Sequence, residues 1–224
     1  YKILENQYPT DTEDVISEIK DKGDGSLLKG SSKMFFDIYK SMFEGKDRTD
    51  TLVFIHGFAN SFEGNLEHIG KLKELFIDNE KSPIKNLLYV SWPTRNHKVF
   101  TYWDDQKDAI ETGRVLARVY ERYLELFISM FRQNEIPPCG SKLHLAVHSM
   151  GNQVLESMLE NIPDRKIISI LGEVLLLHSD VKNDVFEKGK PFTKLENLAE
   201  RTHMYIHNSD DALWISRFTK NLNK

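Results

Sequence analysis

The 224-residue sequence has one cysteine and no long apolar run, and both shortages exclude classes of protein. A lone thiol, at Cys139, provides neither a disulfide framework nor a cysteine-rich zinc site. No stretch approaches the ~20 apolar residues that span a bilayer, and the N-terminus lacks the basic and then apolar order of a signal peptide. We therefore expect a cytoplasmic protein without a membrane span. The first residue is Tyr1 instead of Met, which is compatible with a removed leader.

The sequence also lacks an excess of charge of either sign. Thirty Lys and Arg residues against 34 Asp and Glu residues give a net charge of −4. No run of like charge is present to attract nucleic acid or an anionic membrane. No Gly-x-Gly-x-x-Gly follows a predicted strand and no phosphate loop occurs, which argues against a nucleotide-binding Rossmann protein. The partner that remains is a small or neutral molecule.

The order of the apolar segments predicts an α/β fold. Five short apolar runs are typical of buried parallel strands, at residues 51–55, 87–90, 143–147, 173–177 and 202–206. Helical spacing fills the intervals, and its longest stretch, 104–131, predicts one helix or two helices joined near Gly113. We expect a single domain over 1–224 with a mostly parallel, doubly wound sheet flanked by helices. Residues 1–49 would be an N-terminal helical extension.

Residues 143–152, with the sequence Leu-His-Leu-Ala-Val-His-Ser-Met-Gly-Asn, contain the most informative motif. An apolar strand ends in Ser149 and a helical pattern follows, which is the order of a nucleophile elbow. In the usual Gly-x-Ser-x-Gly signature, Gly151 matches the second glycine. Val147 stands at the first, where we expect its branched side chain to crowd the turn. The alternative is a turn that only connects a strand to a helix.

A second signal lies about ninety residues upstream, where the first predicted strand ends in His56, Gly57 and Phe58. Because the carboxyl ends of parallel strands share one edge of a sheet, this loop should lie near Ser149. The backbone amides of Phe58 and Met150 are the candidate oxyanion donors.

Two aromatic side chains at the same edge are candidate substrate-binding residues, His56 and Trp92. Trp92 belongs to the Ser-Trp-Pro segment after the second predicted strand. For His56, support of the oxyanion loop through hydrogen bonds is the favoured interpretation. Service as a catalytic base is the alternative.

The acid and the base of an acyl-transfer site are harder to place. Asp210 and Asp180 both follow predicted strands, and the chain order serine, acid, histidine favours Asp210. Either carboxylate could instead cap a helix. His148, beside the serine, is interpreted as a packing residue of the elbow. Because no histidine follows Asp210, we predict that the last strand and the catalytic histidine lie outside this chain.

Five motifs occur in register along the chain. They are LVFIHGF at 52–58, VSWP at 90–93, VHSMGN at 147–152, SDV at 179–181 and SDDAL at 209–213. Together they resemble a bacterial α/β-hydrolase family of largely uncharacterised, esterase- or lipase-like proteins, over residues 50–218 or so. The resemblance implies Ser149 as nucleophile and a histidine beyond the last helix.

Two functions from different classes fit these observations. The first is a serine hydrolase that cleaves a small carboxylic ester through an acyl-enzyme, which requires no metal and no cofactor. The second is a non-catalytic α/β-hydrolase-like binding or scaffold protein, which Val147 and the missing histidine favour. The identity of the substrate and the oligomeric state stay open.

Overall fold

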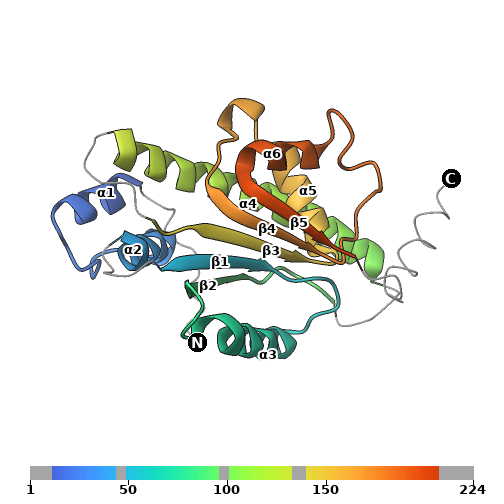
Figure 1. Ribbon diagram of the computed structural model, residues 1–224, viewed down its shortest axis with the longest axis horizontal. Helices are drawn as coiled ribbons and strands as arrows, with labels where there is room; N and C mark the ends of the chain where they lie inside the picture. The colour runs from blue at the N-terminus through green and yellow to red at the C-terminus, as the bar shows by residue number, and fades with distance from the viewer. Residues whose placement is uncertain (1–11, 44–48, 96–100, 133–139, 207–224) are drawn as a thin grey trace.

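The computed structural model describes residues 12–43, 49–95, 101–132 and 140–206. Within these ranges five strands form one sheet in the order β2-β1-β3-β4-β5 (Figure 1). They are β1 (Asp50–Ile55), β2 (Ile84–Val90), β3 (Leu143–His148), β4 (Leu171–Leu177) and β5 (Ala199–Tyr205). Every pair of neighbours is parallel, so the α/β prediction is confirmed.

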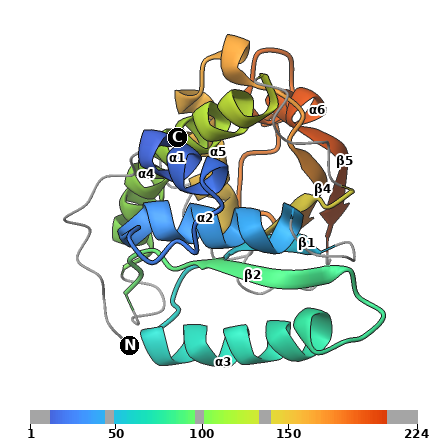
Figure 2. The same cartoon turned by 90° about the vertical axis from the view of Figure 1, so that its left-hand side faces the viewer.

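Helices cover both faces of the sheet. The six α-helices described are α1 (Thr12–Lys20), α2 (Gly30–Phe43), α3 (Phe62–Leu72), α4 (Tyr102–Arg132), α5 (Gly151–Asn161) and α6 (Leu195–Leu198). Helix α3 lies on one face, whereas α2, α4 and α5 lie on the other (Figure 2). None of the helices in the described ranges is long and apolar enough to cross a membrane.

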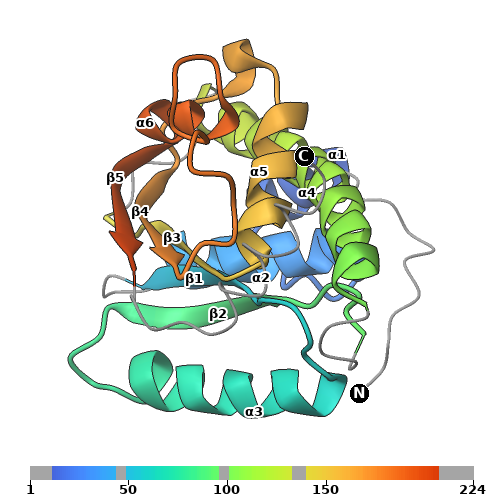
Figure 3. The same ribbon diagram turned by 90° about the vertical axis from the view of Figure 1, so that its right-hand side faces the viewer.

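The strand order places a topological switch point between β1 and β3. From β1 the chain moves outward to β2, then returns through α4 to β3 on the other side of β1. Open α/β sheets bind ligands outside the carboxyl ends of the strands at such a point. Figure 3 faces this edge, where the loops after β1 and β3 lie side by side. The fold therefore brings residues 56–58 and 149–151 to one place.

Helix α4 is a single helix of 31 residues, so the alternative of two helices joined near Gly113 is wrong. A Cβ atom at Gly113 would lie 2.5 Å from both the Ser157 Cβ and the Val154 carbonyl oxygen. The glycine is therefore needed where the backbone of α4 meets α5, and its presence marks a close helix contact instead of a break.

The N-terminal helices pack against the far part of α4. Val15 of α1, Phe35 and Phe36 of α2, and Leu126 of α4 form one buried apolar cluster. The aromatic face of α2 is therefore core. At the other side of the sheet β5 is the edge strand of the described residues, and most of its side chains are exposed. The predicted last helix and Asp210 lie outside the described residues.

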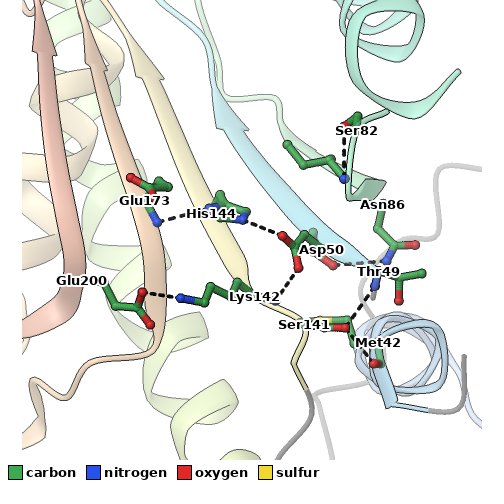
Figure 4. A network of polar contacts seen from close by, with 12 residues as sticks. Met42, Thr49, Asp50, Ser82, Asn86, Ser141, Lys142, His144, Glu173 and Glu200 are labelled. Atoms are coloured by element: carbon green, nitrogen blue, oxygen red, sulfur yellow. Dashed lines mark hydrogen bonds and ion pairs between the residues drawn. The ribbon is translucent and has the colours of Figure 1, made fainter. Parts of the chain in front are cut away.

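A buried polar network ties β1 to β3 at the amino-terminal edge, opposite to the switch point (Figure 4). Asp50 is fully buried and accepts hydrogen bonds from the Lys142 amide at 2.7 Å and from His144 Nε2 at 3.1 Å. The Glu173 amide donates to His144 Nδ1 at 3.1 Å. Since Nδ1 is an acceptor, the ring proton resides on Nε2 and points at Asp50.

We expect Asp50→Ala to lower the free energy of unfolding by about 3 kcal/mol, because it leaves two buried donors without an acceptor. Chemical denaturation monitored by circular dichroism measures this loss. Lys142→Met is the matched control, since it removes only an ion pair between Lys142 and Glu200 at the surface and keeps the amide bond to Asp50. The control should change stability by less than about 1 kcal/mol. Equal losses in both variants would contradict the assignment.

Candidate active site

Ser149 occupies a strained turn directly after β3. Its φ is +50°, in the left-handed region that a residue with a side chain enters at a cost of about 1 to 2 kcal/mol. The Ser149 amide donates to the Leu177 carbonyl of β4 at 2.9 Å. The Asn152 side-chain amide donates to the carbonyl oxygens of Ser149 at 2.9 Å and Val147 at 3.3 Å. These bonds hold the strained turn. Ser149 itself is half-buried at the edge of the sheet.

Val147 does not crowd this turn, so that expectation is wrong. The valine side chain is fully buried in the main apolar cluster together with Leu145 of β3 and Leu176 of β4. It points into the core between the sheet and its helices, while the serine two residues later is lifted to the edge. The left-handed φ of Ser149 forms with valine in the place of the first glycine.

The loop after β1 lies against the elbow. A Cβ atom at Gly57 would lie 2.9 Å from the Ser149 Cβ and 3.1 Å from His148 Nδ1. A Cβ atom at Gly151 would lie 2.6 Å from the His56 carbonyl oxygen. Real Cβ atoms essentially never come within 3.0 Å of another heavy atom, and neither the Ser149 Cβ nor the His56 carbonyl can swing away, so both contacts need glycine. The two segments that the sequence predicted to converge are therefore in contact.

The two candidate oxyanion donors stand on either side of this contact. Met150 immediately precedes α5, and its side chain is fully buried, so the amide is the group it can offer. Phe58 follows Gly57 and is half-buried. Among the hydrogen bonds of the described residues, neither amide has an acceptor. Both can donate to a bound oxyanion, and the helix dipole of α5 adds positive potential near Met150.

His56 and Trp92 support the loop from below instead of facing outward. The Trp92 amide donates to His56 Nε2 at 3.1 Å, so the His56 proton is on Nδ1, which donates to the Gly57 carbonyl at 2.6 Å. The Trp92 indole N–H donates to the His56 carbonyl at 2.8 Å, and the two rings stack. Their exposed fractions are only 1% and 3%. This geometry favours the supporting role for His56 and disfavours substrate contact by Trp92.

Residues of α3 and β2 complete the support of His56. The Asn65 side-chain amide lies 3.4 Å from His56 Nε2 and donates to the Ser91 hydroxyl at 3.2 Å. The Tyr89 hydroxyl donates to Asn65 Oδ1 of the side chain at 2.9 Å, and burial raises the pKa of Tyr89 to about 12. Burial also lowers the pKa of His56 below 6.5. The imidazole is therefore neutral at neutral pH, and both of its nitrogen atoms are used in hydrogen bonds that support the loop.

The lowered pKa of His56 predicts a pH dependence of stability. Because the unfolded chain binds the proton more readily, the folded protein should lose stability as pH falls from 6.5 through the folded pKa. His56→Gln should flatten the curve of unfolding free energy against pH between 7 and about 5. Urea titrations at several pH values measure it. His68→Gln removes a neighbouring charge that is a smaller cause of the lowered His56 pKa than burial, so it should flatten the slope less than His56→Gln does. An unchanged slope in His56→Gln would refute the assignment.

Asp180, the second candidate acid, lies beside the elbow in a buried network. Its amide donates to the Ser149 carbonyl at 3.3 Å. Its Oδ2 atom accepts hydrogen bonds from the Tyr102 hydroxyl at 2.8 Å and from the Gln153 side chain at 3.1 Å. Tyr102 and Gln153 were not among the residues that the sequence singled out. Asp180 therefore joins the loop after β4 to α4 and α5, and it is only 4% exposed.

Two further histidines flank the serine. His148 ends β3 and His178 directly follows β4, with ring centroids 5.9 Å apart. His178 has a φ of +47°, so two neighbouring strands, β3 and β4, are each followed directly by a left-handed residue. No cluster of three or more metal-ligating side chains occurs among the described residues.

Comparison with known proteins adds one finding. A family model described as "Alpha/beta hydrolase of unknown function (DUF900)" matches residues 37–223. The match starts within α2, earlier than the start near residue 50 that the motifs suggest. No curated protein and no solved structure matches the chain significantly.

Proposed function

The chain belongs to this family of alpha/beta hydrolases of unknown function, and on that premise we propose that it is a serine hydrolase of carboxylic esters. Ser149 is the proposed nucleophile. The observation that carries the proposal is the left-handed φ of Ser149 at the switch point, in contact with Gly57 of the loop after β1. A nucleophile elbow depends on this conformation. His178 and Ala59 adopt it as well, but Ser149 combines it with a side-chain hydroxyl and with the contact to Gly57.

The proposed reaction has two steps. In the first, the Ser149 oxygen attacks the ester carbonyl carbon while a base takes its proton. The negative charge on the carbonyl oxygen is stabilised by the Phe58 and Met150 amides, each worth about 3 kcal/mol of barrier. The bond from carbon to the alcohol oxygen then breaks, and the alcohol leaves with the proton. In the second step, water attacks the acyl-enzyme and releases the acid.

Asp210 remains the proposed acid of this site, with Asp180 second. The Oδ2 atom of Asp180 already accepts two side-chain hydrogen bonds, from Tyr102 and Gln153, and that favours a structural role. None of the histidines in the sequence follows Asp210, the position in which this fold places its base. The proposal therefore assigns the base to no numbered residue.

A non-catalytic binding or scaffold protein is the second candidate function. One observation favours it: His56 and Asp180 are both engaged in hydrogen bonds that support the loops around the elbow, so neither is arranged as the base or the acid of Ser149. The other argument for it, a valine that would distort the elbow, does not hold, because Val147 is buried in the core and the left-handed turn forms. The scaffold would use the same edge of the sheet to bind an ester-like or carboxylate ligand without turnover.

Hydrolysis of p-nitrophenyl esters by the full-length protein separates the two candidates. The enzyme should release a rapid burst of p-nitrophenol close to one equivalent, followed by slower steady turnover, because acylation by an activated ester is faster than deacylation. Acetate and longer acyl chains would be compared at equal concentration. Release at the rate of a solution without protein, for every chain length, would leave the scaffold as the function.

A further inference from the structure

The first turn of α4 contacts three loops at the carboxyl edge of the sheet. Asp105 is fully buried there, and the Arg95 amide of the loop after β2 donates to its two carboxylate oxygens at 3.0 and 3.2 Å. The Thr94 hydroxyl beside Arg95 donates to the Asn60 carbonyl of the loop after β1 at 2.7 Å, and the Ala59 amide of that loop acts on the Asp105 carboxylate so as to lower its pKa. Tyr102, three residues earlier, bonds to Asp180 of the loop after β4.

Asp105 and Tyr102 both act on residues 58 and 59 of the loop after β1. Ala59 has a φ of +56°, a conformation that costs an alanine about 1 to 2 kcal/mol. It follows Phe58, whose amide is a proposed oxyanion donor. The Phe58 ring packs edge-on against Tyr102, with centroids 5.9 Å apart. Asp105 thus fixes the peptide after the donor, while Tyr102 fixes the side chain of the donor residue.

Stability alone does not account for this carboxylate. Burial raises the pKa of Asp105 even though its partners, the Arg95 and Ala59 amides and the Arg95 guanidinium, act in the opposite direction. Asp108 on the same helix adds a repelling charge, and it also pairs with Arg95 at 3.0 Å. The folded state therefore holds the ionised form less favourably than water does. What the carboxylate contributes is the geometry of the two loops.

We propose that Asp105 is a positioning residue that holds residues 58–60 in the conformation in which the Phe58 amide faces the oxyanion. This inference rests on the proposed function, because it assigns a catalytic use to the loop. The role predicts a specific effect on the kinetics. A displaced donor weakens the transition state more than the bound substrate, since the charge on the oxygen develops only during attack.

Asp105→Asn and Asp108→Asn form a matched pair for the test. Both remove one carboxylate that pairs with Arg95, but only the first touches the amides of Ala59 and Arg95. With p-nitrophenyl acetate, Asp105→Asn should lower kcat by at least about 10-fold with KM within about twofold, as expected for a misplaced donor. Asp108→Asn should leave both constants within about twofold. Equal kcat values for the two variants would overturn the proposal.

Nuclear magnetic resonance tests the positioning without relying on catalysis or on a folded variant. In the wild-type protein the amide protons of Ala59 and Arg95 should shift with one common midpoint above 3.8, the ordinary pKa of an aspartate. Separate midpoints, or no titration, would overturn the positioning role even if the protein hydrolyses esters. A common midpoint in a protein without esterase activity would support the positioning and refute the proposed function, so the two failures can be told apart.

Discussion

Ser149→Ala is expected to lower kcat for p-nitrophenyl acetate by at least about 1000-fold. The side chain removed is the only group that can form the acyl-enzyme in the proposed mechanism. The fold should persist, because the Ser149 amide and carbonyl make the recorded contacts with Leu177, Asn152 and Asp180. Melting monitored by circular dichroism should therefore show a transition close to that of the wild type, while the burst of p-nitrophenol disappears.

Ser157→Ala provides the control for this prediction. Ser157 is a buried serine of α5 whose hydroxyl donates to the Ile110 carbonyl at 2.8 Å, where α5 meets α4. Its removal should cost about 1 kcal/mol of stability and leave kcat within about twofold. If Ser149→Ala kept the burst, or if both variants lost it equally, Ser149 would not be the nucleophile.

Gly151→Ala is expected to lower kcat by about 100-fold with a smaller change in KM. The added methyl group would lie 2.6 Å from the His56 carbonyl oxygen and 2.9 Å from the Ile55 carbonyl oxygen, both of which are backbone atoms. The start of α5 must then move away from the loop after β1. A displacement of about 1 Å between a nucleophile and its oxyanion donors costs a factor of this size. Steady-state kinetics measures it.

Gly70→Ala is the matched substitution in another helix. Nothing lies within 4 Å of a Cβ atom at Gly70, which is an exposed position of α3. Alanine there should raise stability by up to about 1 kcal/mol and leave kcat unchanged. A Gly151→Ala enzyme as active as Gly70→Ala would contradict the close approach of the elbow and the oxyanion loop.

The sheet could be predicted from the sequence because its signal is local. Each apolar run without a polar face became a parallel strand, although β2, β4 and β5 begin two or three residues earlier than their patterns indicate. The continuity of α4 through Gly113 could not be predicted, since it depends on contact with Ser157, forty-four residues further along the chain. A glycine in a helical pattern has the same appearance whether it breaks the helix or fits against a neighbour.

The candidate site could be predicted only in part. The serine and the loop at 56–58 carry sequence motifs, because their backbone conformations demand glycine nearby. No such motif marks the supporting residues Tyr102, Asp105 and Gln153. The same residue types are common in helices that support no site. Two aromatic and two acidic residues follow one another at 102–105, at the start of the longest helix. They were the one sequence feature that could have pointed to the support of the site. The inward direction of the Trp92 side chain could not be predicted, because an aromatic residue at a strand end can point inward as well as outward.

Covalent labelling with a fluorophosphonate tests the central claim most directly. The reagent would be incubated with the folded, full-length protein, and trypsin digestion would release the peptide 143–165, which ends at Arg165. The account predicts one adduct in this peptide, assigned by fragmentation to Ser149 and absent from Ser149→Ala. A folded protein that takes up no reagent, or that carries the adduct on Ser157 or another residue, would contradict it.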